Sequence, residues 1–408
     1  MRKKILFIDD DQERNGSTVS LEYLVQGFYE KDYEVSILSW KVNEFASAVL
    51  RPYAKIVDGR RWYLPSISLA AYFTYRASFF SFQGLKNSLK DFIKLIVGLF
   101  VSYCVIADIK PDIVYLNEYR VLPAAIAAKL LKIPTVTHIR SRFWEPRFFI
   151  RRYLLAKGIL KYCDVLIAIT RQEKLQFQPY SSKDEMDKIF VIGEFFPEYV
   201  VEAATIAVVK HEHRLPTDKK IVVMLGGIRY LKGTKFFLQA AEIISELRKD
   251  VIFVVVGVHD VVYEEEDPHY YEQCIQIIEK LKKNHNSVYA IGRILNPLDI
   301  IAASDILVSP YVEDHFSRPI VEAWGEKKPV IAVKTKYTID FIEDTIDGIL
   351  VDRDDCQGMV KALNALLDDD AKRIQMGEAG RRKVAEEFEF KKNINRIINI
   401  CDSNFKVQ

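Results

Sequence analysis

The chain has 408 residues, 49% of them hydrophobic, and a formal net charge of only +2. So many apolar side chains exclude an intrinsically disordered chain, and the nearly balanced charge excludes a general polyanion binder. At roughly 100–200 residues for each domain, the length predicts about two domains. The five cysteines stand far apart, which argues against a disulfide framework and a paired-cysteine metal site and is typical of a reducing cytosol.

Short apolar segments rich in valine and isoleucine alternate with helix-length amphipathic segments along the whole chain. The segments of the first half that we expect to be strands are 4–8, 34–40, 112–116, 135–138, 165–169 and 189–192. Those of the second half are 221–225, 252–256, 288–291, 306–308, 330–333 and 349–351. Such apolar strands are typical of parallel sheets covered by helices on both faces. The sequence therefore predicts an α/β fold with two doubly wound, Rossmann-like domains.

The two series of strands define the expected domains. We expect the first domain to span residues 1–200 and the second to span residues 215–388. The weakly patterned stretch 197–220 is the predicted linker, and residues 389–408 are expected to form a helix that packs back on the first domain. Because ligands bind at the carboxyl ends of parallel strands, we expect the site in a central cleft that both domains face.

Two stretches of the first half, 51–94 and 140–161, combine basic and aromatic side chains. The longest apolar run, 95–107, is shorter than the roughly 20 residues of a membrane-spanning helix, so we expect a buried helix there. Within 60–100, a basic patch beside apolar residues would suit an anionic lipid surface. The same spacing also suits a core helix with solvated lysines. Both interpretations stay open.

Residues 305–333 read DILVSPYVEDHFSRPIVEAWGEKKPVIAV and are the most informative stretch. A buried strand ends at Ser309, and Ser317 looks like the N-cap of a following helix. The amide groups at the start of that helix would favour a phosphate. Asp314 and Glu322, eight positions apart, flank this start with carboxylates that suit hydroxyl groups. The pattern predicts a site for a nucleotide sugar.

With these motifs, the chain resembles the family 4 glycosyltransferases of the GT-B fold over nearly its whole length. Asp314 and Glu322 match the family's Glu-x7-Glu pattern with an aspartate at the first position, and the adjacent Glu313 is an alternative for that acid. The resemblance implies that Glu322 holds the ribose hydroxyls, that Asp314 holds sugar hydroxyls, and that the amides of residues 316–320 meet the diphosphate. The implied donor-binding residues of this block are Phe316, Ser317, Arg318, Ile320 and Glu322.

A second family block is a Gly-Arg turn with Lys-Gly five residues later. Lys232 and Gly233 match its second part, after the strand 221–225. Gly227 stands where the family has arginine. Arg229 is a plausible substitute, because a leaving diphosphate needs cations. The resemblance implies that Gly227, Arg229 and Lys232 bind the donor.

Four smaller matches complete the resemblance. Gly16 and Ser17 belong to the first βα turn, where the family has a glycine-rich loop near the donor phosphates. His138 ends a strand at the position where many family members have a functional histidine, although a lone histidine there is more often structural. Gly257 and Arg293 each follow a strand at positions where the family packs the nucleotide base.

The resemblance implies a retaining glycosyltransferase, of hexosyltransferase type, in cell-surface polysaccharide or glycoconjugate synthesis. It would move a sugar from a nucleotide sugar to a glycan or lipid-linked glycan. The implied catalytic residues are His138, Lys232, Asp314 and Glu322. We expect no metal, no other cofactor and no nucleic-acid partner. We expect a cytoplasmic protein, with peripheral contact to the anionic inner face of the membrane as an added hypothesis.

Two alternatives stay open at this point. One is a GT-B-like epimerase or phosphorylase that acts on a sugar nucleotide without an acceptor. The other is a non-catalytic subunit that binds a nucleotide sugar, which the departures at Gly227 and Asp314 favour. Fold analogy alone does not separate these classes. An acceptor-independent product would identify the first alternative, and binding without turnover would identify the second.

Overall fold

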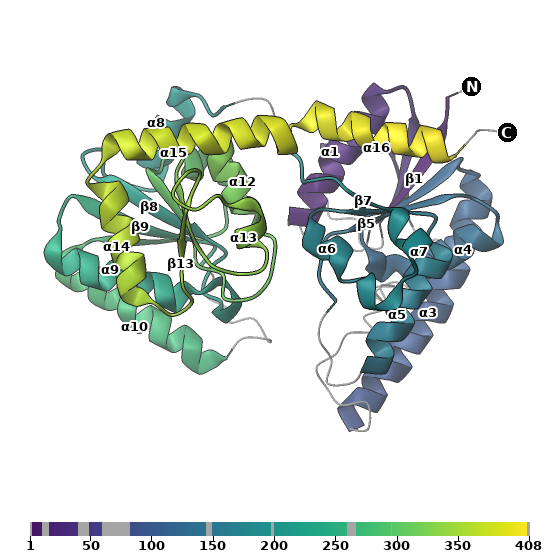
Figure 1. The fold of residues 1–408 in the computed structure, drawn as a ribbon, viewed down its shortest axis with the longest axis horizontal. Helices are drawn as coiled ribbons and strands as arrows, with labels where there is room; N and C mark the ends of the chain where they lie inside the picture. Colours follow the sequence, from purple (N-terminus) through teal and green to yellow (C-terminus); the bar gives the residue numbers. More distant parts are fainter. Residues whose placement is uncertain are drawn as a thin grey trace. The chain divides into compact units, whose positions relative to one another are not determined.

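The computed structural model describes residues 2–9, 16–39, 49–58, 82–143, 149–196, 200–258, 267–294 and 296–405. The chain forms two compact α/β units (Figure 1). Unit 1 combines Met1–Phe195 with Phe390–Gln408, and unit 2 is Phe196–Glu389. Unit 1 is therefore built from two stretches that are far apart in the sequence.

Unit 1 contains a seven-stranded parallel sheet. Its strands are β1 (Lys4–Asp9), β2 (Glu34–Ser39), β3 (Lys55–Asp58), β4 (Ile113–Leu116), β5 (Thr135–Ile139), β6 (Val165–Ala168) and β7 (Ile189–Val191). Their order is β3-β2-β1-β4-β5-β6-β7. Six of them confirm the predicted strands to within one residue at each end. The sequence pattern did not predict β3, because this short edge strand has only two apolar residues.

Helices cover both faces of this sheet. They are α1 (Gly16–Glu30), α3 (Phe82–Ile109), α4 (Leu122–Leu130), α5 (Phe149–Tyr162), α6 (Arg171–Leu175), α7 (Lys183–Asp187) and α16 (Phe390–Asn404). Leu6 and Ile8 of β1 belong to the core formed with α3, α4 and α5. Ile5 and Phe7 belong to the core formed with α1 and α16. This alternation is what a strand covered on both faces requires.

The helix α16 packs on α1 at the end of the chain (Figure 1). Gly27 of α1 lies so close to Ile394 that a Cβ atom at Gly27 would collide with the isoleucine side chain. Asp402 accepts hydrogen bonds from Lys3 Nζ at 2.6 Å and from the Tyr33 hydroxyl at 2.8 Å. The last helix is thus an integral part of unit 1.

Unit 2 contains a six-stranded parallel sheet. Its strands are β8 (Lys220–Leu225), β9 (Val251–Val256), β10 (Val288–Ile291), β11 (Ile306–Ser309), β12 (Val330–Val333) and β13 (Ile349–Val351). Their order is β10-β9-β8-β11-β12-β13. All six confirm the predicted strands. The helices are α8 (Ala203–Glu212), α9 (Thr234–Leu247), α10 (Pro268–His285), α11 (Pro297–Ala302), α12 (Arg318–Gly325), α13 (Thr338–Phe341), α14 (Cys356–Leu367) and α15 (Asp370–Lys383).

The prediction of a linker over 197–220 is wrong. Unit 2 begins at Phe196, and α8 lies inside this stretch and contacts α11. The carboxylate of Glu326 also accepts a hydrogen bond from the Val201 N–H at 3.2 Å. Val209 is the buried residue of α8, so this helix shows almost no hydrophobic periodicity, and its sequence resembles a linker.

The buried helix predicted over 95–107 is also corrected. This run is the C-terminal half of α3, and only one side of it is buried. Val101, Val105 and Ile106 belong to the core, whereas Ile96 and Phe100 are more than half exposed. The apolar face that remains exposed is described further below.

Each sheet has a point where the strand order reverses. In unit 1 this point lies between β1 and β4, and in unit 2 it lies between β8 and β11. The loops after these two strands leave toward opposite faces of the sheet, which opens a crevice at the carboxyl ends. The functional side chains of each unit are therefore expected at these two positions.

Candidate functional site

The Lys-Gly motif of unit 2 lies at the reversal point of its sheet. Lys232 ends a short 3-10 turn after β8, and Gly233 adopts a left-handed conformation with φ of 67°. A Cβ atom at Gly233 would collide with the carbonyl oxygen of Pro310, just after β11. The Leu231 carbonyl also accepts a hydrogen bond from the Val312 N–H at 3.2 Å. The glycine therefore brings the loop after β8 against the loop after β11.

Lys232 shares this position with two rings that the sequence did not single out. Its Nζ lies 3.9 Å from the centroid of the Tyr311 ring, which is a cation–π contact. The Tyr311 ring in turn stacks on His315, with centroids 6.2 Å apart and an angle of 19° between the rings. These contacts hold the lysine ammonium group over the end of β11.

Positive charge is concentrated around His315. His315 is exposed to solvent on one side, yet many protein atoms lie around its imidazole, and the resulting desolvation lowers its pKa. The positive charges of Lys232 and Arg229 lower this pKa further. The two cations therefore both lie near His315. Because its imidazole is neutral, it adds no third positive charge there. That Arg229 substitutes for the family arginine stays a prediction.

Gly227 lies where the chain leaves no space for the family arginine. Its φ is 69°, and a Cβ atom there would collide with the carbonyl oxygen of Gly257. The Gly227 N–H donates to the Val256 carbonyl at 2.8 Å, and the Gly257 N–H donates to the Ile291 carbonyl at 2.9 Å. The two predicted donor-binding glycines are thus brought together, backbone against backbone, at the ends of β8 and β9.

The helix α12 begins after Ser317, as the sequence predicted, but the serine side chain does not cap it. The Ser317 Oγ lies 2.8 Å from the Ser309 Oγ at the end of β11. The expectation that the amides of 316–320 meet a diphosphate needs correction, because the Ile320 N–H donates to the Ser317 carbonyl at 3.1 Å and Pro319 has no N–H. The amides of 316–318 remain the candidates.

The acids of this block are held by partners within unit 2. Glu322 accepts a hydrogen bond from Arg318 Nε at 2.8 Å, and both side chains are largely buried. Asp314 accepts from the Lys336 N–H, after β12, at 3.1 Å. The Phe316 ring packs against Phe341 with centroids 5.7 Å apart, so its side chain belongs to the core. Arg318 is thus committed to the carboxylate of Glu322.

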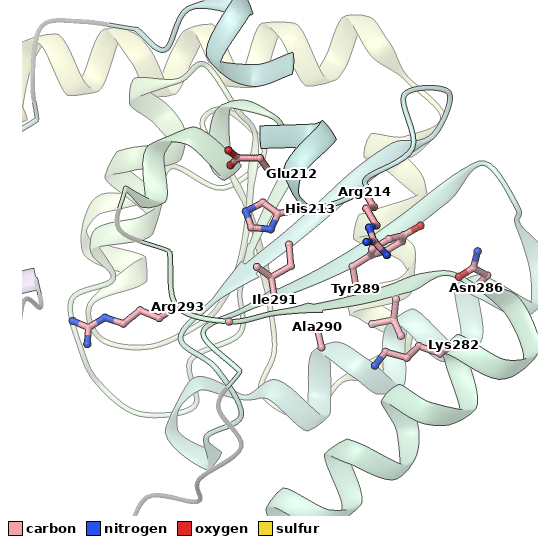
Figure 2. A pocket seen from close by; sticks show the side chains of 11 residues that line it. Glu212, His213, Arg214, Lys282, Asn286, Tyr289, Ala290, Ile291 and Arg293 are labelled. Carbon is pink, nitrogen blue, oxygen red and sulfur yellow. The ribbon is translucent and has the colours of Figure 1, made fainter. Parts of the chain in front are cut away.

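A cavity of about 690 Å³ lies beside β10, the edge strand of the sheet (Figure 2). It is lined by Glu212, His213, Arg214, Lys282, Asn286, Val288, Tyr289, Ala290, Ile291, Gly292 and Arg293. Figure 2 shows that the Arg293 side chain points away from Glu212 and His213. Arg293 is the predicted donor-binding residue that borders this cavity. Because Lys232 follows β8, two strands away, the cavity lies to the side of the reversal point.

In unit 1, His138 lies at the end of β5 and is almost fully buried. Its Nδ1 lies 2.8 Å from the Tyr115 hydroxyl and 3.3 Å from Arg140 Nη2. An arginine N–H can only donate, so Nδ1 must accept, and we assign the proton of the neutral ring to Nε2. Burial and then the charge of Arg140 hold the pKa of His138 well below its usual value. The histidine is therefore a neutral hydrogen-bond donor at Nε2.

Arg140 connects this histidine to a buried polar network at the reversal point of unit 1. Its Nη1 donates to the carboxylate of Glu194, and both side chains are almost fully buried. Its Nε donates to Asn117, after β4, at 3.2 Å from both the carbonyl and Oδ1. Asn117 Nδ2 donates to Asp9 Oδ1, at the end of β1, at 2.9 Å. The ends of β1, β4 and β5 are thus joined by side chains.

The predicted donor-binding residues of the first βα turn adjoin this network. Asn117 Nδ2 donates to the Ser17 carbonyl at 3.3 Å, and the Ser20 hydroxyl donates to the Gly16 carbonyl at 3.0 Å and to Glu194. The remainder of that turn, residues 10–15, lies outside the described residues. The structure therefore brings Gly16, Ser17 and His138 to one end of the unit 1 sheet.

Sequence reasoning missed several polar residues of this network. Asp9, Asn117 and Glu118 each stand at the end of a buried strand, and this was the signal that could have identified them. Glu118 accepts hydrogen bonds from the Tyr119 N–H at 2.8 Å and the Ser141 hydroxyl at 2.9 Å. Burial raises the pKa of Glu118. Its carboxyl group therefore lies at the carboxyl end of β4 with the network residues.

Among the described residues, no group of three or more His, Cys, Asp or Glu side chains is placed to hold a metal ion. The Lys232, Arg229 and His315 cluster carries positive charge instead. That the site works without a metal or cofactor stays a prediction.

The neutral state of His138 predicts a pH dependence of the stability of unit 1. Because its folded pKa lies below its unfolded value of about 6.5, the unfolded chain binds the additional proton. The free energy of unfolding should therefore fall as the pH is lowered from about 7 to 5, by up to about 1.4 kcal/mol per pH unit. Urea unfolding, followed by hydrogen exchange of the amides of β4 and β5, measures this slope.

Replacing His138 with asparagine, whose side-chain oxygen can accept in place of Nδ1, should flatten this slope. His315→Asn is the matched control, because it removes a histidine of lowered pKa from unit 2 and should leave the unit 1 slope unchanged. An unchanged slope in His138→Asn would contradict a neutral, buried His138.

Comparison with known proteins agrees with this geometry. Residues 206–383 match the family model of the glycosyl transferases group 1. The chain is 26% identical over 250 residues to the D-inositol 3-phosphate glycosyltransferase of Xylanimonas cellulosilytica. That match covers 58% of this chain, and it covers only 56% of the relative's own length.

Two further proteins extend the comparison. The chain is 23% identical over 274 residues to the capsular polysaccharide biosynthesis glycosyltransferase CapM of Staphylococcus aureus, which covers 65% of this chain and 69% of CapM. Its fold is similar to that of Anabaena Alr3699/HepE, solved in complex with UDP and glucose. The TM-score is 0.76 at 17% identity, over 98% of this chain and 100% of HepE. The family-model match over residues 206–383 and the similarity of the whole chain to the fold of HepE confirm the predicted resemblance to the GT-B glycosyltransferases.

Proposed function

We propose that this protein is a retaining glycosyltransferase that moves a hexose from a nucleotide sugar to a glycan or lipid-linked glycan. The observation that carries the proposal is the cationic cluster of Lys232, Arg229 and the neutral His315 at the reversal point of unit 2. It lies within the residues that match the glycosyl transferase model. CapM, by its name, acts in capsular polysaccharide synthesis, which supports a cell-surface glycan as the product.

The proposed chemistry is stabilisation of negative charge on the leaving diphosphate as the glycosidic bond breaks. Lys232 and Arg229 would supply two positive charges, and the amides of 316–318 at the start of α12 would add hydrogen-bond donors. These groups would do without a metal what a divalent ion does in other transferases. We propose that the acceptor hydroxyl attacks from the face that the leaving group vacates, and that its proton passes to the departing phosphate.

Two further side chains have proposed roles in binding the donor. Glu322 would accept hydrogen bonds from the ribose hydroxyls, and its hydrogen bond from Arg318 would hold the carboxylate in place. His138, as a neutral donor at Nε2, would hydrogen-bond a hydroxyl of the transferred sugar. A protonated His138 would be a second buried cation beside Arg140, which is unfavourable. The network around Arg140 therefore favours the neutral form.

The proposal is tested by incubating the purified full chain with a panel of nucleotide sugars, including UDP-glucose, with and without glycan acceptors. We expect release of UDP and a product with the anomeric configuration of the donor, measured by NMR, and no loss of activity in EDTA. An isomerised sugar nucleotide without acceptor would instead identify an epimerase. Tight binding without turnover of any donor would identify a binding subunit.

Glu322→Gln is expected to weaken UDP-glucose binding by about tenfold or more, since a hydrogen bond to a charged group is lost at a buried position. Isothermal titration calorimetry measures this change. Glu378→Gln is the matched control, because Glu378 forms an exposed ion pair with Lys327 and should bind the donor like the unmodified chain. Equal affinity of both variants would contradict the assignment of Glu322.

A further inference from the structure

The helix α3 of unit 1 exposes a continuous apolar face. Its exposed side chains include Leu89 at 62%, Phe92 at 57% and Phe100 at 61% of their full area. The complete set is Leu85, Leu89, Phe92, Ile93, Ile96, Phe100 and Tyr103. Gly84–Ile109 is apolar and long enough to cross a membrane, and little more than a quarter of it is buried. This is an unusual amount of exposed apolar surface for one helix of a globular unit.

Helix geometry places all seven side chains on one stripe. At about 100° per residue, they fall within about 100° of one another around the helix axis. The core residues Val101 and Val105 lie on the opposite side, and the core residue Ile106 lies beside the other edge of the stripe. The stripe runs from Leu85 to Tyr103, a length of about 27 Å at 1.5 Å per residue. α3 is therefore held on the sheet by one face and presents a second apolar face outward.

Two lysines border this stripe. Lys86 and Lys90 are four residues apart and exposed, and the same geometry places them along one edge of the apolar face. The helix has two acids: Asp91, which is buried at 2% exposure, and Asp108, which is exposed near the C-terminal end of the helix, beyond the stripe. Figure 1 shows α3 extending to the tip of unit 1. The exposed side of this helix is thus apolar with a positive border.

We propose that this face of α3 lies on the surface of an anionic lipid bilayer. Its apolar side chains would enter the boundary between headgroups and acyl chains, and its lysines would contact anionic headgroups. A second copy of the chain is a poorer occupant, because the border of this face has two exposed lysines, whereas the helix has only one exposed acid, Asp108, near its C-terminal end. The inference is independent of the proposed sugar transfer, because it concerns lipid binding without any donor.

The test is co-sedimentation of the full chain with vesicles of phosphatidylcholine, alone or mixed with phosphatidylglycerol. We expect binding to the mixed vesicles, weaker binding to phosphatidylcholine alone, and release at high salt. The double variant Leu89→Gln/Phe92→Gln should bind the mixed vesicles at least about tenfold more weakly. Replacing Lys86 and Lys90 with glutamine should weaken binding by about fivefold for each lysine.

Leu247→Gln/Ile374→Gln is the matched control, since both residues are at least as exposed as Leu89 but lie on unit 2. This variant should bind vesicles like the unmodified chain. The inference is overturned if the unmodified chain ignores anionic vesicles, or if the Leu89→Gln/Phe92→Gln variant binds them unchanged. It is also overturned if that variant only converts a dimer to a monomer, measured by light scattering.

A second measurement separates lying on a bilayer from crossing one. Membranes of cells that express the chain are washed with alkaline carbonate, which releases peripheral proteins. We expect the chain in the released fraction, because Val101, Val105 and Ile106 hold α3 against the core of unit 1. Retention in the membrane would overturn the surface-lying arrangement and indicate that α3 inserts as a span.

Discussion

Replacing Lys232 with alanine is expected to lower kcat for sugar transfer by about a hundredfold to a thousandfold, the loss seen when one preorganised charge-stabilising group is removed. The reason is the position of its ammonium group, which lies over the Tyr311 ring at the reversal point of the unit 2 sheet. Because the charge matters most as the bond breaks, kcat should fall more than the affinity for UDP-glucose.

The measurement is steady-state transfer from whichever nucleotide sugar the panel identifies, with UDP affinity measured in parallel. Lys232→Arg should keep part of the activity, because it keeps the charge but not the compact ammonium group. Lys235→Ala is the matched control: this lysine lies in the first turn of α9, three residues after Lys232, and its Nζ donates to Gln273 at 2.7 Å. A similar loss in both alanine variants would mean that the effect is a general loss of charge and not the position of Lys232.

Replacing Glu194 with alanine is expected to destabilise unit 1 by about 3–5 kcal/mol, which is the largest stability loss that we predict. Arg140 would then be a buried cation without its carboxylate partner. The Ser20 hydroxyl would lose the same carboxylate. Glu194→Gln should cost less, because the amide oxygen still accepts hydrogen bonds.

Hydrogen exchange of the β1, β4 and β5 amides measures this loss in unit 1 alone. Arg2→Ala removes an exposed ion pair with Asp32 in the same unit, and should cost about 1 kcal/mol or less. The double variant Arg140→Met/Glu194→Leu should recover much of the stability of Glu194→Ala, since no uncompensated charge stays buried. If the double variant is as unstable as the sum of its parts, the ion pair does not explain the loss.

The sheets of this protein could be predicted because their strands are short, apolar and separated by clear helices. Within the part of the chain that the structure describes, twelve of the thirteen sheet strands were predicted in this way. The hydrophobic pattern did not predict the elements that bury few side chains. β3 is a half-exposed edge strand, and α8 buries little beyond Val209. The prediction of a buried helix over 95–107 was wrong for a different reason. The sequence does not show whether an apolar residue is exposed or buried, and one face of α3 is exposed.

The site could be predicted only where a motif fixes the backbone. Lys232 and Gly233 were predicted from the family motif, and the left-handed conformation of Gly233 explains why a glycine stands at this position. The rings of Tyr311 and His315 were not, since their contact with Lys232 depends on two loops more than seventy residues apart in the chain. Gly227 looked like a defect in the family pattern. The structure shows a position where Gly257 leaves no space for a side chain.

The division of the chain into units has a consequence for its synthesis. Unit 2 is one continuous stretch, so a ribosome delivers all of it before residues 390–408 emerge. Unit 1 cannot be completed until then, because α16 supplies Ile394 against Gly27 and Asp402 to Lys3 and Tyr33. The half of the protein that is translated first is therefore the half that finishes folding last. Until residues 390–408 have been synthesised, the apolar surface of α1 that packs against α16 stays exposed, and chaperones can bind it.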